Sequence, residues 1–442
     1  MEVYKAKIIT VAAVIFLIVV IVVARICFKS SKGFFLVCGA DIAAILAVLI
    51  WLYLQYRIDC RRRLLESNSI TSDGKELRKE FSFLRKVAGV PTKFRYKELE
   101  AATDNFQSLI GQGASASVYK GKLDDGTLVA VKRITAEQHG EKEFRAEVAA
   151  IASVQHINLV RLFGYSLAVG GPRFLVYEFI HNGSLDGWIF PHGGRHSGLR
   201  GCLAWELRYR VAIDVAKALA YLHHDCRSKI LHLDVKPENI LLDANFRAIV
   251  TDFGLSKLMG KDESRVITTV RGTRGYLAPE WLLQRGVSEK SDVFSYGMVV
   301  LEIIGGRRNV RLREDDKERY WSYFPRIVSE KERQGRLMEI VDERLVEKGG
   351  GIDEKQIKIL VHVALWCIQE DPKLRPTMAC VVDMLEGRVV MDQPPETKMV
   401  IVDILSINQD RKKKTPLTSS KEESEITPAS NGSLSISVLS GR

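Results

Sequence analysis

The hydrophobic pattern of this chain changes from strand-like to helical partway along its length, and that change restricts the folds that it can adopt. Between Ile110 and Glu178, short segments rich in β-branched and aromatic residues predict strands at 117–120, 128–133, 161–165 and 173–179. One helical pattern, at 141–153, interrupts them. Beyond Asp186 the apolar residues follow helical spacing at 209–223, 292–304 and 356–369. This order predicts an α+β fold with two lobes, the first mainly an antiparallel sheet plus one helix and the second mainly helical.

Two long apolar runs precede the folded region. Residues 8–24 and 33–56 each have close to the ~20 residues that a helix needs to cross the hydrocarbon core of a bilayer. The arginines at 57–63 follow the second run, and the positive-inside tendency places them in the cytoplasm. Residues 1–56 are therefore predicted to be a membrane anchor with one or two transmembrane helices, and the domain that follows is predicted to be cytoplasmic.

Two topologies fit this anchor. In the hairpin that we favour, both runs span the membrane, although the basic loop between them, 25–32, then lies outside. In the alternative, 8–24 is a cleaved signal sequence and only 33–56 spans, although no small-x-small cleavage site clearly follows the first run. In both topologies almost no chain remains outside the membrane to bind a ligand.

Composition separates the remaining segments. Residues 57–92 form a charged linker, Phe94–Phe106 reads as a helix leading into a folded domain at 93–388, and the Ser/Thr-rich tail at 389–442 is predicted to be disordered. The net charge of +11 favours attraction to anionic membrane lipid. Nucleic-acid binding is the rival explanation of that charge, but no recognition module supports it. The seven cysteines include no CxxC pair, which favours reduced thiols over a disulfide framework or a zinc site.

The segment His232–Asn239 reads His-Leu-Asp-Val-Lys-Pro-Glu-Asn, and Asp252-Phe253-Gly254 begins thirteen residues after it ends. Phosphoryl transfer needs a base for the substrate hydroxyl, a positive charge for the moving phosphoryl group and oxygen ligands for a metal ion. Asp234 is the candidate base, and Lys236 is the candidate positive charge. Asn239 and Asp252 are the candidate ligands of Mg²⁺, and Mn²⁺ has the same preference for oxygen ligands.

Two motifs earlier in the chain suit the phosphates of a nucleotide. Gly111-Gln112-Gly113-Ala114-Ser115-Ala116 predicts a hairpin whose backbone N–H groups approach phosphates closely, although Ala116 stands where a third glycine would complete the pattern. Val129-Ala130-Val131-Lys132 is a buried-strand pattern that ends in a lysine. Lys132 is predicted to hold phosphate oxygens and to pair with Glu147 on the following helix. Glu143 is the competing partner, and we prefer Glu147 because apolar residues mark the buried side of the helix next to it.

Further segments complete a resemblance to the eukaryotic protein kinases, and within them to the plant receptor-like kinases related to the Pelle/IRAK group. They are Phe174–Phe179, Asn182–Asp186, Ala220–His223 and Gly272–Glu280. The resemblance covers roughly residues 95–388, and the nearest subgroup has a minimal ectodomain. It implies a bilobal kinase fold and a serine/threonine protein kinase that transfers the γ-phosphoryl group of ATP to protein hydroxyls.

The resemblance implies roles that periodicity does not reveal. Tyr177 matches the gatekeeper position, Glu178 and Ile180 match hinge residues that contact adenine, and Asp186 matches a position near the ribose. The other residues that it assigns to ATP binding are Ile110, Gly111, Gly113, Val118, Ala130, Lys132, Glu147 and Leu241.

The resemblance also implies structural roles in the second lobe. Thr273 matches the residue that supports Lys236, and Asp292 matches the residue that binds backbone N–H groups of the catalytic segment. Glu280 and Arg375 match a buried ion pair.

One position departs from the commoner motif of the family. Leu233 stands where arginine usually precedes the catalytic aspartate and pairs with a phosphorylated activation loop. Leucine provides no charge-assisted hydrogen bond to phosphate. We therefore predict a weaker dependence of activity on activation-loop phosphorylation.

Three functions are compared. The leading one is an active kinase anchored in the plasma membrane, with protein substrates and a membrane receptor or co-receptor as partners. The second is a pseudokinase or scaffold that acts by binding a receptor, which Ala116 and Leu233 leave open but the complete set of catalytic residues disfavours. The third, a small-molecule kinase, is disfavoured by the full activation segment at 252–280, which shapes a peptide-binding surface in protein kinases.

Overall fold

The computed structural model describes residues 91–397 except 114–115, 135–139, 153, 168–171, 192–200, 261–262, 264, 284, 315–318 and 348–350. The chain divides into two units, 1–84 and 85–442, and only the second contains described residues. The predicted membrane segments and the tail beyond 397 lie outside them. None of the helices in the described part is long and apolar enough to span a bilayer.

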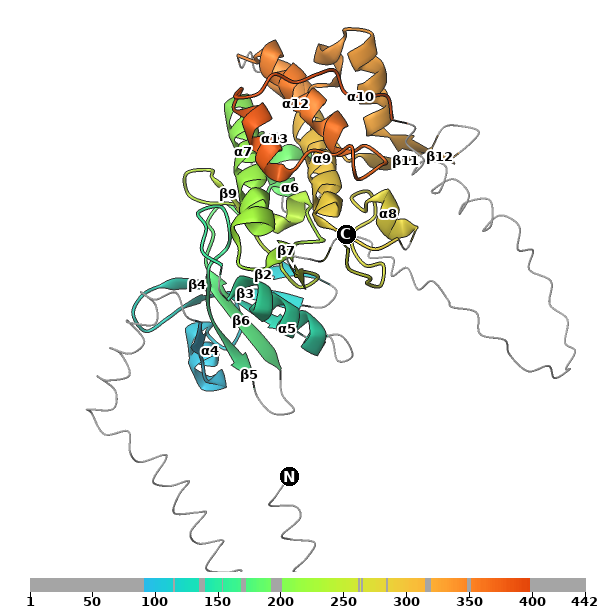
Figure 1. The fold of residues 1–442 in the computed structure, drawn as a ribbon. Helices are drawn as coiled ribbons and strands as arrows, with labels where there is room; N and C mark the ends of the chain where they lie inside the picture. The colour runs from blue at the N-terminus through green and yellow to red at the C-terminus, as the bar shows by residue number, and fades with distance from the viewer. Residues whose placement is uncertain are drawn as a thin grey trace, which may run out of the picture. The chain divides into compact units, whose positions relative to one another are not determined.

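The first lobe is built on a six-stranded sheet with the order β1-β5-β6-β4-β3-β2 (Figure 1). Its strands are β1 (Thr92–Lys93), β2 (Leu109–Gln112), β3 (Ala116–Lys122), β4 (Leu128–Ile134), β5 (Leu162–Leu167) and β6 (Arg173–Glu178). All neighbouring pairs are antiparallel except β1 and β5, which are parallel. Helix α5 (Gly140–Ile151) lies beside β6 and adds Phe144 and Ile151 to the apolar core.

The alternation of β4 separates the core from the functional face of the sheet. Val129 and Val131 are fully buried and pack with Phe174 on one side. Because successive side chains of a strand point to opposite faces, Ala130 and Lys132 face the other side. This geometry aims Lys132 away from the apolar cluster.

Residues 92–106, which we name the N-terminal strap, cover the apolar face of the sheet. Strand β1 extends the sheet beside β5, and the Phe94 N–H donates to the Tyr165 carbonyl at 2.8 Å. Gly164 permits this pairing, because a Cβ atom at that position would lie 2.0 Å from the Thr92 carbonyl oxygen and 2.6 Å from the Phe94 ring. The strap is therefore part of the folded domain.

Helix α4 (Tyr96–Ala102) forms the centre of the strap. The Glu98 carboxylate accepts from the Arg95 N–H at 2.9 Å, and Leu99 is fully buried against the sheet. The helix predicted at 94–106 is too long, because Asp104, Asn105 and Phe106 have left-handed φ angles of 50°, 55° and 59°. This turn returns Phe106 to the sheet, where its ring stacks on Phe174 with centroids 5.4 Å apart.

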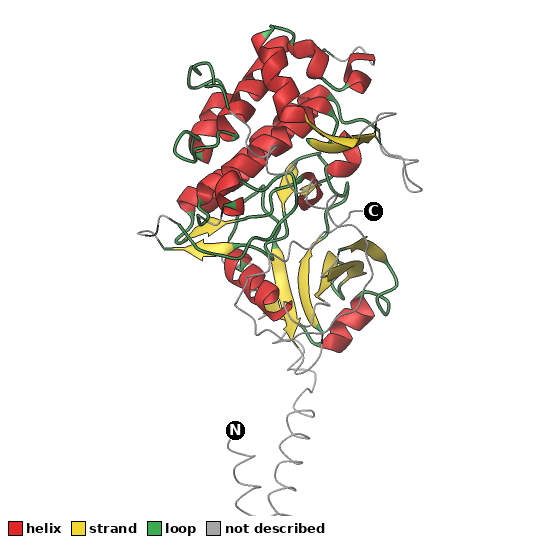
Figure 2. Ribbon diagram, turned by 90° about the vertical axis from the view of Figure 1, so that its right-hand side faces the viewer, coloured by secondary structure: helices red, strands yellow, loops and turns green. Residues whose placement is uncertain are grey.

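The second lobe is mainly helical (Figure 2). Its main helices are α7 (Trp205–Ala220), which continues into the π-helical turn η1 (Tyr221–Asp225), α9 (Glu289–Gly305), α12 (Glu354–Cys367) and α13 (Met378–Leu385). Every residue of α9 from Ser291 to Ile304 is buried, because α7 and α12 both pack against it. Helix α9 therefore forms the centre of this lobe.

Further elements complete the rest of the chain beyond β6. They are α6 (Asp186–Ile189), β7 (Lys229–Leu231), η2 (Pro237–Asn239), β8 (Ile240–Leu242), β9 (Ala248–Val250), β10 (Lys257–Met259), α8 (Pro279–Leu282), β11 (Val310–Glu314), β12 (Arg319–Tyr323), α10 (Phe324–Arg333), η3 (Leu337–Ile340) and α11 (Glu343–Glu347). Strand β7 pairs with β10, β8 with β9, and β11 with β12, all antiparallel. The prediction of a sheet lobe followed by a larger helical lobe is confirmed.

Two long-range contacts hold the C-terminal part of this lobe. The Arg375 guanidinium makes two bonds of 2.8 Å to the Glu280 carboxylate, and both side chains are buried. Residues 388–397 then cross α12, where Trp366 donates to the Asp392 carbonyl at 3.1 Å and Gln369 donates to the Pro395 carbonyl at 2.9 Å.

Candidate functional site

Lys132, Glu147 and Asp252 come from β4, α5 and the segment after β9, and the structure brings them together. The Lys132 ammonium lies 2.9 and 2.8 Å from the two Glu147 oxygens and 2.7 Å from Asp252 Oδ1. Glu147 is 1% exposed, whereas the Asp252 side chain is 41% exposed. The buried carboxylate thus anchors the lysine, and the exposed one remains open to a ligand.

Electrostatic interactions keep Asp252 and Lys132 charged. Desolvation opposes ionisation of Asp252, but the Lys132 ammonium outweighs it and lowers the pKa of Asp252 to about 2. Burial raises the pKa of Glu147, and Lys132 opposes that rise. Desolvation opposes the charge of Lys132 as well, yet the two carboxylates together raise its pKa above the ordinary value. An ammonium held in this way can bind an anionic ligand at neutral pH.

Tyr177 adds a contact that the sequence did not predict. Its hydroxyl donates to Glu147 Oε1, and the side chain is 5% exposed. Tyr177 lies on β6 opposite Ala130, two residues from Lys132 along β4. Burial, followed by the nearby Glu147 charge, raises the pKa of Tyr177 well above its usual range, so the phenol stays neutral. The Tyr177 hydroxyl therefore helps to fix the orientation of α5 through Glu147.

Asp234 lies at the centre of a second cluster. Lys236 Nζ is 2.8 Å from Asp234 Oδ2 and 2.9 Å from the Thr273 hydroxyl, and that hydroxyl donates to Asp234 Oδ1 at 3.2 Å. The Asn239 amide nitrogen donates to the Asp234 carbonyl and to its Oδ2, both at 2.9 Å. The side chain of Asp234 is thus fixed by three neighbours, one of which belongs to the activation segment.

Asp292, from α9, shapes the backbone before Asp234. Its carboxylate accepts from the His232 N–H at 2.8 Å and the Leu233 N–H at 2.7 Å, and it lies 2.8 Å from His223 Nε2. Burial opposes ionisation of this carboxylate, but the hydrogen bond from His223 and the charges nearby lower its pKa overall. These bonds hold Leu233 at a left-handed φ of 65°. The carboxylate therefore presents the next residue, Asp234, to the site.

Leu233 is 4% exposed and lies in an apolar cluster beneath the activation segment. The buried members of this cluster are Leu231, Leu233, Met259, Trp281 and Val287. The segment is also held by two backbone bonds of 2.9 Å between Val266 and Val287. Apolar packing around Leu233 and backbone pairing therefore hold this part of the activation segment in place.

The other residues assigned to ATP binding lie on the strands and on the connection between the lobes. Val118 pairs with Lys132 across β3 and β4, and Ile110 is 48% exposed on β2. The Gly113 N–H donates to the Ala116 carbonyl at 2.8 Å, which closes the glycine-containing turn. Glu178 ends β6, and Ile180 follows it two residues later.

Asp186 and Leu241 lie on the helical side of the connection. Leu241, on β8, forms a β-bridge with Ser184, two residues before Asp186. The Oδ1 atom of Asp186 is buried and has no hydrogen-bond partner among the described residues. Asp186 thus offers an acceptor that a ligand hydroxyl can use.

The described residues include no group of three or more His, Cys, Asp or Glu side chains that could hold a metal ion by themselves. Asn239 and Asp252 are an amide and a carboxylate, and the amide nitrogen of Asn239 is already engaged with Asp234. The side-chain oxygen of Asn239 is the atom that would bind a cation. Two oxygen ligands suit Mg²⁺, which keeps several water molecules and binds through substrate phosphates as well.

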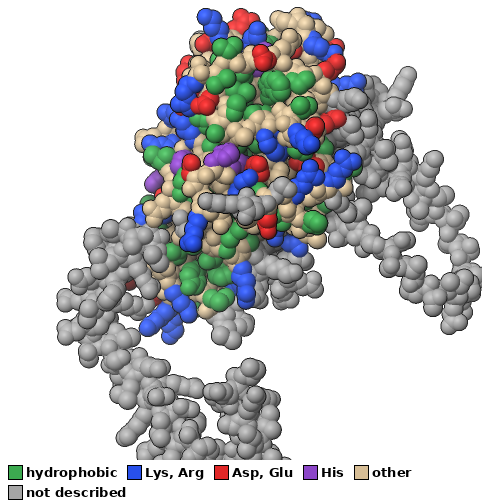
Figure 3. Space-filling view, in the orientation of Figure 1, with side chains coloured by type: hydrophobic (Ala, Val, Ile, Leu, Met, Phe, Trp, Pro, Cys, Tyr) green, Lys and Arg blue, Asp and Glu red, His purple; other side chains and the backbone are tan. Residues whose placement is uncertain are grey.

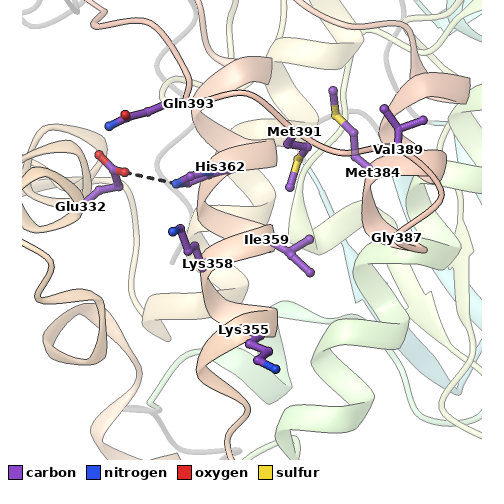
Figure 4. Close-up of a pocket in the computed structure, with 10 residues that line it drawn as sticks. All are labelled: Glu332, Lys355, Lys358, Ile359, His362, Met384, Gly387, Val389, Met391 and Gln393. Carbon is purple, nitrogen blue, oxygen red and sulfur yellow. Dashed lines mark hydrogen bonds and ion pairs between the residues drawn. The ribbon is translucent and has the colours of Figure 1, made fainter.

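A groove of about 510 Å³ lies on the helical lobe, away from these clusters (Figure 4). It is lined by α12 and by the segment after α13, including Lys358, His362 and Met391. None of the residues predicted for catalysis or ATP binding lines it, so we assign it no part in catalysis. On the face shown in Figure 3, Lys and Arg side chains are interspersed with Asp and Glu over the helical lobe.

Comparison with known proteins agrees with this geometry. A model of the protein kinase domain matches residues 105–385. A protein described as a "probable receptor-like protein kinase" of Arabidopsis thaliana is 61% identical over 415 residues, which cover 93% of this chain and 91% of that protein.

Longer relatives match as well. A G-type lectin S-receptor-like serine/threonine-protein kinase of Arabidopsis thaliana is 47% identical over 353 residues, 80% of this chain and 41% of that protein. A rice protein of the same description is 43% identical over 321 residues, 71% of this chain and 38% of that protein. The chain spans about two fifths of the length of these lectin-type relatives. The chain therefore belongs to the protein kinase family and, within it, to the receptor-like serine/threonine kinases.

Proposed function

We propose that this protein is a membrane-anchored serine/threonine kinase, active in receptor-like signalling, that uses the two clusters around Lys132 and Asp234. As a member of the protein kinase family it uses ATP and a divalent metal ion, and it acts on protein substrates. The observation that carries the proposal is the complete bonding of both clusters. Every group that phosphoryl transfer requires is present and is oriented by a neighbour.

In this proposal the first cluster holds the nucleotide. Lys132, fixed by Glu147, would contact the α- and β-phosphates, while Asp252 and Asn239 would supply oxygen ligands to the Mg²⁺ that accompanies ATP. The unpartnered Oδ1 of Asp186 accepts from a ribose hydroxyl. Bound metal would neutralise phosphate charge and so favour transfer of the γ-phosphoryl group.

The second cluster acts on the protein substrate. Asp234 orients the substrate hydroxyl and accepts its proton, and Lys236 neutralises charge on the moving phosphoryl group. Thr273 supports both side chains from the activation segment at 3.2 and 2.9 Å. Because every catalytic group is present, the scaffold alternative is not favoured.

The packing of Leu233 supports weak dependence on activation-loop phosphorylation. The apolar cluster and the Val266–Val287 pairing hold the segment without a phosphate. We expect single alanine substitutions at Thr268 and Thr269 to leave most of the activity, because neither residue is needed for this packing. Loss of activity in both variants would contradict the idea. Ser264, a third candidate phosphorylation site, lies outside the described residues.

We further propose a plasma-membrane location with the kinase domain in the cytoplasm. The apolar runs at 8–24 and 33–56 and the receptor-like relatives support it. A membrane receptor or co-receptor would supply the stimulus, and anionic lipid would attract the basic linker.

The full chain, purified in detergent, tests the catalytic assignment. Transfer of labelled γ-phosphate from Mg-ATP to a degenerate Ser/Thr peptide library is measured for the parent, Asp234→Asn and Lys132→Met. Label in the parent and at most a trace in both variants supports the proposal. An unlabelled library with a parent that still binds ATP would instead favour a scaffold.

A further inference from the structure

Arg308 contacts the catalytic segment and the activation segment at the same time. It follows α9, and its Nη2 atom pairs with the Glu238 carboxylate. Its Nη1 atom donates to the Tyr276 hydroxyl at 2.9 Å, and the guanidinium lies 4.0 Å from the centre of the Phe190 ring. One planar side chain thus joins two loops that are not otherwise neighbours in sequence.

The Tyr276 end of this link is anchored in the core. Its hydroxyl donates to Glu302 Oε2 at 2.6 Å, and Glu302 is 1% exposed on α9. The Asn309 N–H donates to the other Glu302 oxygen at 2.9 Å, and the Ser295 hydroxyl donates to the Tyr276 carbonyl at 2.7 Å. Tyr276 is therefore fixed relative to α9 by both its side chain and its backbone.

Both ends of the link are close in sequence to the groups around the proposed base. Glu238 is followed directly by Asn239, whose amide donates to Asp234. Tyr276 comes three residues after Thr273, whose hydroxyl also donates to Asp234. Movement of either loop would therefore displace a hydrogen-bond partner of Asp234.

Leu233 cannot make such a link, because its side chain has no hydrogen-bond donor. We infer that Arg308 is a positioning residue for the protein substrate, which fixes the peptide-binding end of the activation segment against the catalytic segment. This inference rests on the proposed function, because it assumes that Asp234 receives the substrate hydroxyl. Beyond the proposed function, the inference is that Arg308, in the segment after α9, makes the charge-assisted link between the catalytic and activation segments. This link requires no phosphate.

The position of Arg308 predicts which kinetic constant depends on it. The contacts of Arg308 lie on the Asp234 side of the site, whereas the nucleotide contacts depend on Lys132, Glu147 and Asp252. In Arg308→Gln we expect the KM for an acceptor peptide to rise about tenfold, as loss of a charge-assisted link implies. The KM for ATP should stay within about twofold of the parent value.

The experiment uses the full chain in detergent, with the best acceptor peptide that the parent selects from the degenerate library. Arg307→Gln is the matched control, because it removes the same charge from the neighbouring residue, whose guanidinium lies 4.0 Å from the Phe324 ring centre. Arg308→Lys retains charge but cannot reproduce the planar fork, so it should fall between the parent and Arg308→Gln. The melting temperature of each variant is recorded beside its kinetics.

The outcomes separate the two proposals. An active parent with a selective rise in peptide KM in Arg308→Gln, partly rescued by lysine, supports the role of Arg308. An unchanged peptide KM overturns that role, and so does an equal rise in both KM values together with a lower melting temperature. A parent that transfers no phosphate refutes the proposed function itself, and the role of Arg308 with it.

Discussion

Replacing Gly164 by alanine should detach the N-terminal strap from the sheet. The added Cβ atom would lie 2.0 Å from the Thr92 carbonyl oxygen and 2.6 Å from the Phe94 ring, where real contacts are at least 3.0 Å. The strand β1 must therefore retreat. The bond from the Phe94 N–H to Tyr165 would be lost, at about 0.5–1.5 kcal/mol. Partial exposure of the half-buried Phe94 ring adds about 0.8–1.5 kcal/mol, half the value of a full burial.

The sum, about 1.3–3 kcal/mol, is partly offset by the stabilisation of up to about 1 kcal/mol that a Gly→Ala change brings through the unfolded state. We expect a melting temperature lower by a few degrees, measured by calorimetry on the full chain. Hydrogen exchange should show faster exchange confined to residues 92–106 and the facing edge of β5. Gly201→Ala is the control, because a Cβ atom at that position meets nothing within 4 Å. Parent-like exchange across the strap in Gly164→Ala would refute the reasoning.

Three further substitutions test the interior. Arg375→Met leaves the buried Glu280 carboxylate without its charged partner and should cost about 3–5 kcal/mol in urea unfolding; a loss below about 1 kcal/mol would contradict this. Burial raises the pKa of Glu302 to about 7, whereas the pKa of an unfolded glutamate is about 4.3. The folded state therefore binds more protons than the unfolded state, and the contribution of Glu302 to stability falls as pH rises from about 4.3 through 7. Glu302→Gln should therefore gain stability relative to the parent across that range, and a pH-independent difference would disprove the assignment. Tyr177→Phe removes a donor from Glu147 and should cost about 1–3 kcal/mol by calorimetry, whereas an unchanged melting temperature would argue that this bond contributes little.

The strands and long helices could be predicted because their signals are local. The pattern at 128–133 gave β4 (Leu128–Ile134), and the pattern at 292–304 gave most of α9 (Glu289–Gly305). The period of the apolar residues is set by the element itself, so no distant partner is needed to read it. The end of α9 at a glycine and its start after Ser288 follow the same local logic.

Features that depend on distant partners were missed. Strand β1 is two residues long and carries no pattern of its own; its pairing depends on the absence of a side chain at Gly164, seventy-two residues after Thr92. The hairpin of β11 and β12 was not predicted either, although Val310–Glu314 alternates apolar and charged residues and Arg319–Tyr323 holds three aromatic residues, a pattern that favours strands.

The site shows the same division. Motif residues such as Lys132 and Asp234 could be named from sequence, because the chemistry requires those residue types at that spacing. The bond from Tyr177 to Glu147 and the link through Arg308 could not, because they depend on how separate elements meet in three dimensions.

Because residues 388–397 cross α12, they determine where the C-terminal boundary of a soluble kinase fragment should lie. The domain match ends at residue 385, before the Asp392 and Pro395 carbonyl groups that accept hydrogen bonds from Trp366 and Gln369. In a fragment that ends there, the Trp366 indole N–H and the Gln369 amide would lose these carbonyl acceptors, and the apolar surface under Met391 would be exposed. A fragment that extends to Thr397 should consequently be the more soluble of the two and the better candidate for crystallisation.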